Sequence, residues 1–116
     1  LYRWAAGLQE AAPGFREIRI KPYLNDHFTS MKAEQRTPYG LASSGWTKEG
    51  DALTLTVEIP ANTTAEVYVP SAAADKVTES GRALDGRSDL KVAGWDDGYT
   101  LVRLGSGRYE FRSTLK

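Results

Sequence analysis

The stretch Asp51–Pro70 constrains the fold more than any other part of the sequence. In Leu53–Ile59 every second residue is apolar, and polar residues stand between them. A period of two is the pattern of a strand with one buried face. After a turn at 60–63 the alternation resumes over Ala65–Val69, so the stretch predicts an antiparallel β-hairpin. Its predicted core residues are Leu53, Leu55, Val57, Ile59, Val67 and Val69.

Shorter alternating segments follow one another along most of the remaining chain. About eight or nine short strands, with turn signals every ~8–12 residues, are typical of a β-sandwich or barrel. We therefore predict an all-β fold, an antiparallel two-sheet β-sandwich that is jelly-roll-like. The main turn sequences between its strands are Thr37–Gly40, Glu49–Asp51, Ser80–Arg82 and Asp96–Gly98.

The N-terminal end has a different pattern. One apolar stripe with helical spacing is formed by Leu1, Trp4, Ala5 and Leu8. Pro13-Gly14 closes this region. We predict a short N-terminal helix stub, with residues 1–12 the end of a helix from a preceding domain and residues 13–116 the sandwich. A short helix that caps the sandwich's own sheet is the alternative, because a helix this short needs something to pack on.

Composition limits the classes of partner. The 116 residues include 15 basic and 15 acidic side chains, so the net charge is zero and no basic stripe suits a nucleic acid. No apolar run approaches the ~20 residues of a membrane span, so we expect no membrane partner. The absence of cysteine excludes disulfides but leaves the compartment open. Because the chain begins with Leu1 and its single methionine is Met31, we expect a processed product or a piece of a longer protein.

The sequence offers no convincing catalytic or metal site. His27 is the single histidine, and no nucleophile-elbow motif, cysteine or second histidine accompanies it. Asp96-Asp97 precedes a glycine, which is ordinary turn chemistry. Glycoside hydrolysis needs two carboxylates roughly 5–10 Å apart. We expect the candidate carboxylates to be solvated on outward strand faces; they are Glu17, Glu34, Glu58 and Glu66. We therefore assign no catalytic, cofactor-binding or metal-binding residue and expect no cofactor.

Aromatic residues are the remaining candidates for binding. Trp46 and Trp95 could each present a ring on which a sugar stacks, whereas packing in the core or in an interface is the alternative. They are the sugar-stacking candidates of the sequence.

The order and spacing of several motifs resemble the C-terminal region of bacterial α-L-rhamnosidases, which are glycoside hydrolases. The resemblance covers most of the chain and is clearest between Ala6 and Pro70. The motifs that carry it are Ala6-Gly7-Leu8, Pro13-Gly14-Phe15, EIRIKP at Glu17–Pro22, TPYG at Thr37–Gly40, Trp46, and IPANTTAEVYVP at Ile59–Pro70.

This resemblance implies a non-catalytic C-terminal β-sandwich behind a catalytic (α/α) barrel in the same chain. It implies that the parent enzyme removes terminal α-L-rhamnose from glycans or glycosides with inversion, using one carboxylic acid and one carboxylate. Both would lie upstream of Leu1, so no site residue is carried over to this chain. The alternatives are a carbohydrate-binding module that uses a surface tryptophan and an Ig-like protein-interaction domain.

Overall fold

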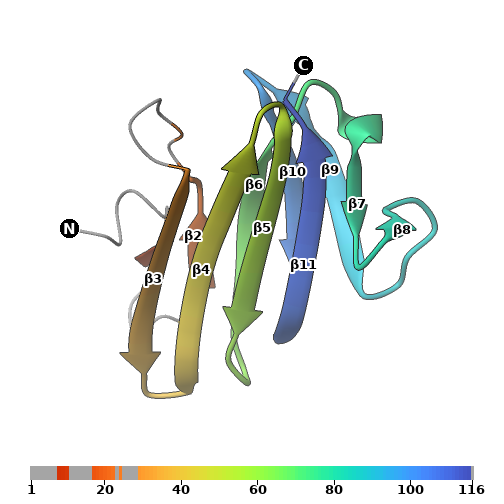
Figure 1. Ribbon diagram of the computed structural model, residues 1–116. Coiled ribbons are helices and arrows are strands. Elements are labelled where there is room, and N and C mark those ends of the chain that lie inside the picture. Colours follow the sequence, from red (N-terminus) through yellow and green to blue (C-terminus); the bar gives the residue numbers. More distant parts are fainter. Residues whose placement is uncertain (1–7, 11–16, 23, 25–28, 116) are drawn as a thin grey trace.

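The computed structural model describes residues 8–10, 17–22, 24 and 29–115, and these form two sheets packed face to face (Figure 1). Sheet A has the strand order β1-β2-β6-β10-β9, and sheet B has the order β3-β4-β5-β11-β7-β8. The strands are β1 (Leu8–Glu10), β2 (Glu17–Ile20), β3 (Ser30–Thr37), β4 (Gly40–Glu49), β5 (Ala52–Ile59), β6 (Thr64–Pro70), β7 (Val77–Glu79), β8 (Arg82–Ala83), β9 (Leu90–Asp96), β10 (Tyr99–Leu104) and β11 (Gly107–Thr114). A 3₁₀ turn, η2 (Ala74–Lys76), precedes β7.

Neighbouring strands in both sheets run antiparallel, except that β2 and β6 are parallel. In Figure 1, β4, β5 and β11 stand side by side in one layer, with β6 and β10 behind them. The predicted all-β fold, an antiparallel two-sheet sandwich, is confirmed.

The predicted hairpin in Asp51–Pro70 is wrong in its pairing, although both of its strands are present. β5 lies between β4 and β11 in sheet B, whereas β6 lies between β2 and β10 in sheet A. The turn at 60–63, where Asn62 has a φ of 59°, therefore carries the chain from one sheet to the other. Alternation cannot distinguish the two arrangements, because a strand buries alternate residues whether its partner lies beside it or across the core.

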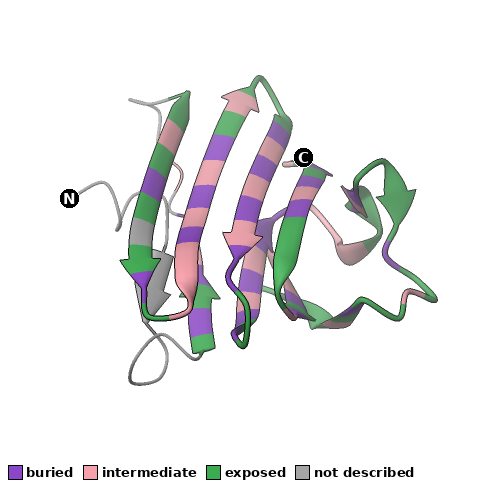
Figure 2. Ribbon diagram, turned by 90° about the horizontal axis from the view of Figure 1, so that it is seen from below, coloured by how far each residue is buried: buried purple, intermediate pink, exposed green. Residues whose placement is uncertain are grey.

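The core lies between the inner faces of the two sheets. All six predicted core residues of Asp51–Pro70 are buried, as are residues from nearly every other strand. Figure 2 shows the alternation of buried and more exposed positions along the strands. The largest fully buried side chains are those of Trp46, Phe111, Ile18, Ile20, Leu53 and Leu55.

The described part of the N-terminal region is a strand. Leu8–Glu10 pairs antiparallel with β2, at the edge of sheet A. The predicted helix therefore does not extend to Leu8. Pairing with β2 gives the backbone N–H and C=O groups of this segment hydrogen-bond partners, whereas a helix this short is only marginally stable. The rest of that predicted helix, residues 1–7 and 11–12, lies outside the described residues, and a preceding domain stays a prediction.

Candidate functional site

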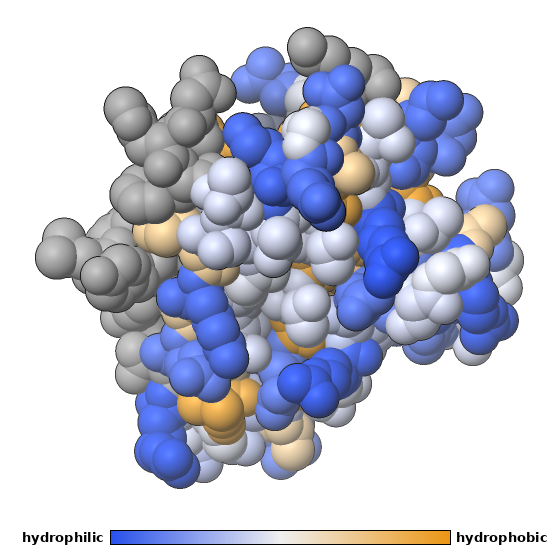
Figure 3. Space-filling view, in the orientation of Figure 1, coloured by the Kyte–Doolittle hydropathy of each residue, from blue (hydrophilic) through white to orange (hydrophobic). Residues whose placement is uncertain are grey.

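The outer faces of the two sheets differ in chemistry. On sheet B the strand register brings Glu34, Ser43, Glu58 and Arg108 into one row across four strands. Two further rows on one side of it consist of Thr, Ser, Gly, Lys, Arg and Glu residues, and Leu41 is paired with Arg36 on the other side. Hydrophilic and pale colours dominate this view of the molecule (Figure 3). The outer face of sheet A carries charged side chains too, such as Glu66 and Arg103, but it also has a group of aromatic and aliphatic side chains.

The aromatic side chains of sheet A gather on β6 and β10. Tyr68 of β6 lies directly opposite Leu101 of β10, and Tyr99 is two residues before Leu101 on the same face. The rings of Tyr68 and Tyr99 meet edge to face, with their centroids 6.2 Å apart and their planes at 82°. The ammonium nitrogen of Lys21 lies 5.2 Å from the Tyr68 centroid and 5.0 Å from the Tyr99 centroid, which is within cation–π range.

These side chains line a groove of about 360 Å³, which we call the tyrosine groove. Gly94 of β9 is paired with Leu101, and a methyl group placed on Gly94 would meet no atom within 4 Å. Asp96, paired with Tyr99, brings a carboxylate to the same face. The residues that line the tyrosine groove are Lys21, Tyr68, Ala93, Gly94, Trp95, Asp96, Asp97, Tyr99 and Leu101.

Of the two tryptophans predicted as stacking platforms, Trp95 is among the residues that line the tyrosine groove, and Trp46 is not. Trp46 is only 2% exposed and is one of the largest core side chains, so it has no ring face to offer a sugar. Trp95 is 46% exposed. It is paired with the buried residue Thr100, however, so the register directs its side chain away from the face that carries Tyr99 and Leu101. Its indole N–H donates to the Ser71 carbonyl at 3.1 Å.

The candidate carboxylates are dispersed over two surfaces. Glu17 and Glu34 are exposed, and Glu58 and Glu66 are half-buried on outer faces. Register places Glu34 and Glu58 on either side of Ser43, two strand spacings or about 9.5 Å apart. Both line an open hollow of about 600 Å³ on the polar outer face of sheet B, together with Ser43 and Arg108.

The remaining sequence candidates are a turn and a residue outside the described part. Asp97 and Gly98 have φ values of 51° and 85°, so both central positions of the turn between β9 and β10 have positive φ. This confirms the turn prediction for Asp96-Asp97. His27 lies outside the described residues.

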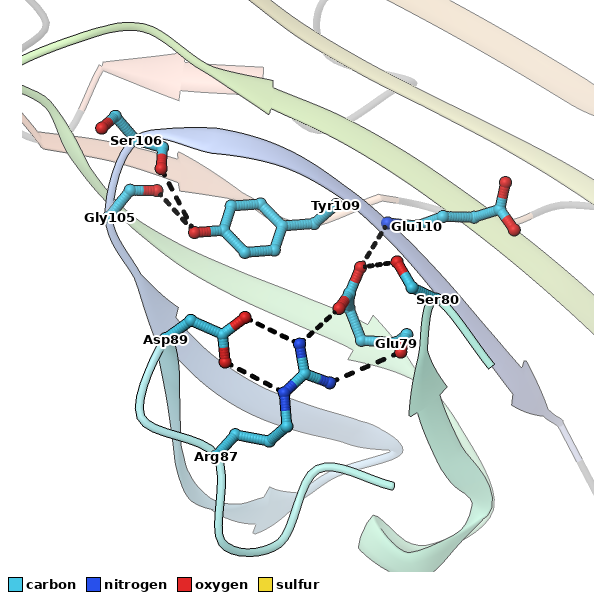
Figure 4. Close-up of polar contacts among 8 residues, drawn as sticks. All are labelled: Glu79, Ser80, Arg87, Asp89, Gly105, Ser106, Tyr109 and Glu110. Atoms are coloured by element: carbon cyan, nitrogen blue, oxygen red, sulfur yellow. Dashed lines mark hydrogen bonds and ion pairs between the residues drawn. The ribbon is translucent and has the colours of Figure 1, made fainter. Parts of the chain in front are cut away.

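An ion-pair cluster beside β7 was not predicted from the sequence (Figure 4). Arg87, in the segment before β9, donates two hydrogen bonds to Asp89, at 2.9 and 2.7 Å. Its Nη2 atom also donates to the Glu79 carboxylate at 2.7 Å. The side chains of Arg87 and Glu79 are 9% and 3% exposed, so this contact is shielded from water. The second Glu79 carboxylate oxygen accepts hydrogen bonds from the Ser80 hydroxyl and from the Glu110 amide.

These contacts shift the pKa values of the Glu79 and Asp89 carboxyl groups. Burial disfavours the charged form of Glu79, but hydrogen bonds from Ser80, Arg87 and the Glu110 amide outweigh it, so the pKa of the Glu79 carboxyl lies below its ordinary value. The hydrogen bonds from Arg87 also lower the pKa of Asp89. Both oxygens of the Glu79 carboxylate bond to protein groups, whereas the Asp89 side chain bonds to Arg87 and is 50% exposed. The cluster therefore ties the segment before β9 to β7 and β11.

Tyr109 closes the other end of the same region (Figure 4). Its hydroxyl donates to the carbonyls of Gly105 and Ser106, at 3.2 and 3.4 Å. Burial, and then the negative charges of Asp89 and Glu79, raise the pKa of the Tyr109 phenol above its ordinary value. The phenol therefore stays protonated and holds the turn before β11.

Neither a metal centre nor a membrane-spanning helix is found in the part of the chain that the structure describes. No group of three or more His, Cys, Asp or Glu side chains is placed there to hold a metal ion. No helix within the same residues has the length and apolar character needed to cross a bilayer.

Comparison with known protein families assigns the chain to one of them. The family model of the bacterial alpha-L-rhamnosidase C-terminal domain matches residues 7–84. The chain belongs to this family. It is 29% identical over 111 residues to an alpha-L-rhamnosidase of Streptomyces avermitilis, and 27% identical over 113 residues to one of Formosa agariphila. These alignments cover 96% and 97% of the chain but only 10% and 12% of those relatives, so the chain spans about a tenth of their length.

Solved structures support the same assignment. The alpha-L-rhamnosidase of Streptomyces avermitilis, crystallised with L-rhamnose, superposes with a TM-score of 0.84 and 27% identity. That match covers 97% of this chain and 10% of the larger one. The alpha-L-rhamnosidase of Dictyoglumus thermophilum gives a TM-score of 0.81 and 26% identity, covering 95% of this chain and 12% of the other.

Proposed function

We propose that this chain is the non-catalytic C-terminal accessory domain of an α-L-rhamnosidase, attached to a catalytic barrel that precedes it in the same polypeptide. The family match over residues 7–84 carries the proposal. The small share of each relative that the chain covers supports it, because most of those enzymes lies outside the matched region.

The chemistry of the described residues is consistent with an accessory role. Inverting glycoside hydrolysis requires a carboxylic acid with a raised pKa and a carboxylate base that face each other across the scissile bond. The buried acid Glu79 has a lowered pKa and is held by Arg87, which suits it to neither task. The acid and base that hydrolyse terminal α-L-rhamnose would therefore belong to the preceding domain.

The test compares two polypeptides, the 116-residue chain alone and the longer natural polypeptide with its preceding sequence. Both are assayed with p-nitrophenyl α-L-rhamnoside at equal concentrations. We expect hydrolysis with inversion of the anomeric centre by the longer polypeptide alone. Turnover by the isolated chain would refute the non-catalytic role, and a longer polypeptide inactive on every α-L-rhamnoside would refute the assignment of the parent enzyme.

A further inference from the structure

The tyrosine groove has the mixed character of a small carbohydrate site rather than that of a packing surface. It is concave, its walls are aromatic and aliphatic, and its lining includes one basic residue, Lys21, and two acidic residues, Asp96 and Asp97. We propose that it binds a single pyranose unit, a 6-deoxyhexose of the rhamnose type. The choice of sugar rests on the proposed function, whereas the location of the site rests on the groove itself.

The groove is held in shape before any ligand arrives. The Tyr99 hydroxyl donates to the Pro22 carbonyl at 3.2 Å, which fixes the ring over the end of β2. The edge of one tyrosine ring meets the face of the other, and the Lys21 ammonium lies within cation–π range of both. A ligand would therefore pay little to order these side chains, since preorganisation reduces the cost of binding.

The size of the groove suits one sugar ring. Its volume of about 360 Å³ is at the lower end of the range for small-molecule sites. Gly94 keeps the floor open beside Leu101, because any side chain at that position would project into the groove. The positive φ of Gly94, 147°, also disfavours other residues there.

The distribution of polar groups matches a neutral, hydroxylated ligand. Asp96 accepts hydrogen bonds and Lys21 donates them, so adjacent sugar hydroxyls find both kinds of partner. The side chains of Tyr68 and Leu101, which lie opposite each other, supply an apolar surface for ring C–H groups and for the methyl group of a 6-deoxyhexose. A ligand with a hydroxyl in place of that methyl would have to bury it against this surface, at a cost.

The experiment is an NMR titration of the isotope-labelled 116-residue chain with methyl α-L-rhamnopyranoside. We expect shift changes confined to the backbone amides of the tyrosine groove in the unmodified chain. We expect methyl α-L-mannopyranoside, which differs only by the 6-hydroxyl, to bind more weakly. Tyr68→Ala should weaken binding by about tenfold, which is about 1.4 kcal/mol. The matched control is Tyr39→Ala, which removes another half-buried tyrosine, in the turn between β3 and β4, and should bind like the unmodified chain.

Other outcomes overturn the proposal. Shift changes elsewhere on the chain, or none at all, would refute the site, and equal binding of the two methyl glycosides would refute recognition of the 6-methyl group. If no sugar binds and Tyr68→Ala destabilises only the longer polypeptide, the groove is a contact with the preceding domain instead. In each case the longer polypeptide would still hydrolyse rhamnosides, so failure of the groove is distinguishable from failure of the proposed function.

Discussion

Replacing Trp46 with alanine separates a core residue from a sugar platform. Trp46 is 2% exposed, and register places it between Met31 and Leu55 on the inner face of sheet B. A buried aromatic side chain removes about 150–250 Å² from water, which is about 4–6 kcal/mol at ~25 cal/mol per Å². Measured losses for Trp→Ala are about 3–5 kcal/mol, because neighbours collapse only partly into the cavity. The neighbours of Trp46 are held in paired strands and have little freedom to move into the cavity. We therefore expect Trp46→Ala to lower the free energy of unfolding by about 4 kcal/mol.

The assay is urea unfolding followed by circular dichroism. With an m-value of ~2 kcal/mol/M, a loss of about 4 kcal/mol lowers the midpoint by about 2 M. A domain of this size has about 5–15 kcal/mol of stability in total, so Trp46→Ala remains measurable only if the unmodified chain is well within that range. Trp46→Phe, which leaves a smaller cavity, serves as the milder variant.

The matched control is Trp95→Phe on the surface. This change removes the hydrogen bond to the Ser71 carbonyl and little buried area, so we expect a loss of about 1 kcal/mol. If Trp46→Ala costs less than about 1 kcal/mol, or if the control costs as much, the assignment of Trp46 to the core is wrong.

Three further predictions concern the ion-pair cluster, a turn and the outer carboxylates. Because the pKa of Glu79 is lowered in the folded chain, its stabilisation is present above its ordinary value of 4.5 and is lost as the pH falls through the folded pKa. Thermal unfolding of the unmodified chain should therefore depend more steeply on pH below 4.5 than that of Glu79→Gln; equal slopes would contradict this sign. Gly98→Ala, at a φ of 85°, should cost about 1–2 kcal/mol in urea unfolding, and a neutral result would mean that the turn relaxes. In the longer polypeptide, Glu34→Gln and Glu58→Gln should leave kcat for p-nitrophenyl α-L-rhamnoside unchanged, and a large drop in kcat would give them a catalytic role.

Many of the strands could be predicted from the alternation of apolar and polar residues, because the apolar residues of a strand are the ones that it buries in the core. Alternation located β5 and β6; Gly50 lies just before β5, Pro60 follows it, and Pro70 ends β6. Pairing could not be predicted, because it depends on contacts between residues far apart in the sequence. The segment 60–63 illustrates this: it has the composition of a hairpin turn, yet it joins two sheets.

The buried cluster could not be predicted for a related reason. Glu79 follows Val77 at an inward position of a three-residue strand, where a carboxylate contradicts the usual pattern. That contradiction was the available signal, but the compensating cation, Arg87, lies in a weakly patterned segment eight residues further on. Only the folded chain shows that the two meet.

A β-bulge accounts for the different faces of sheet A to which the register directs Tyr99 and Trp95. The register of β9 against β10 shifts between Leu101 and Val102, so that Ala93 is left without a partner. Without this extra residue, Ala93 would face Leu101 and Trp95 would face Tyr99, which would put the indole on the outer face of sheet A. With it, Asp96 faces Tyr99, Gly94 opens the floor of the tyrosine groove, and the indole turns away toward Ser71. One inserted residue thus places Asp96, instead of the Trp95 ring, opposite Tyr99. The positive φ of Gly94 is the local backbone conformation that permits the bulge.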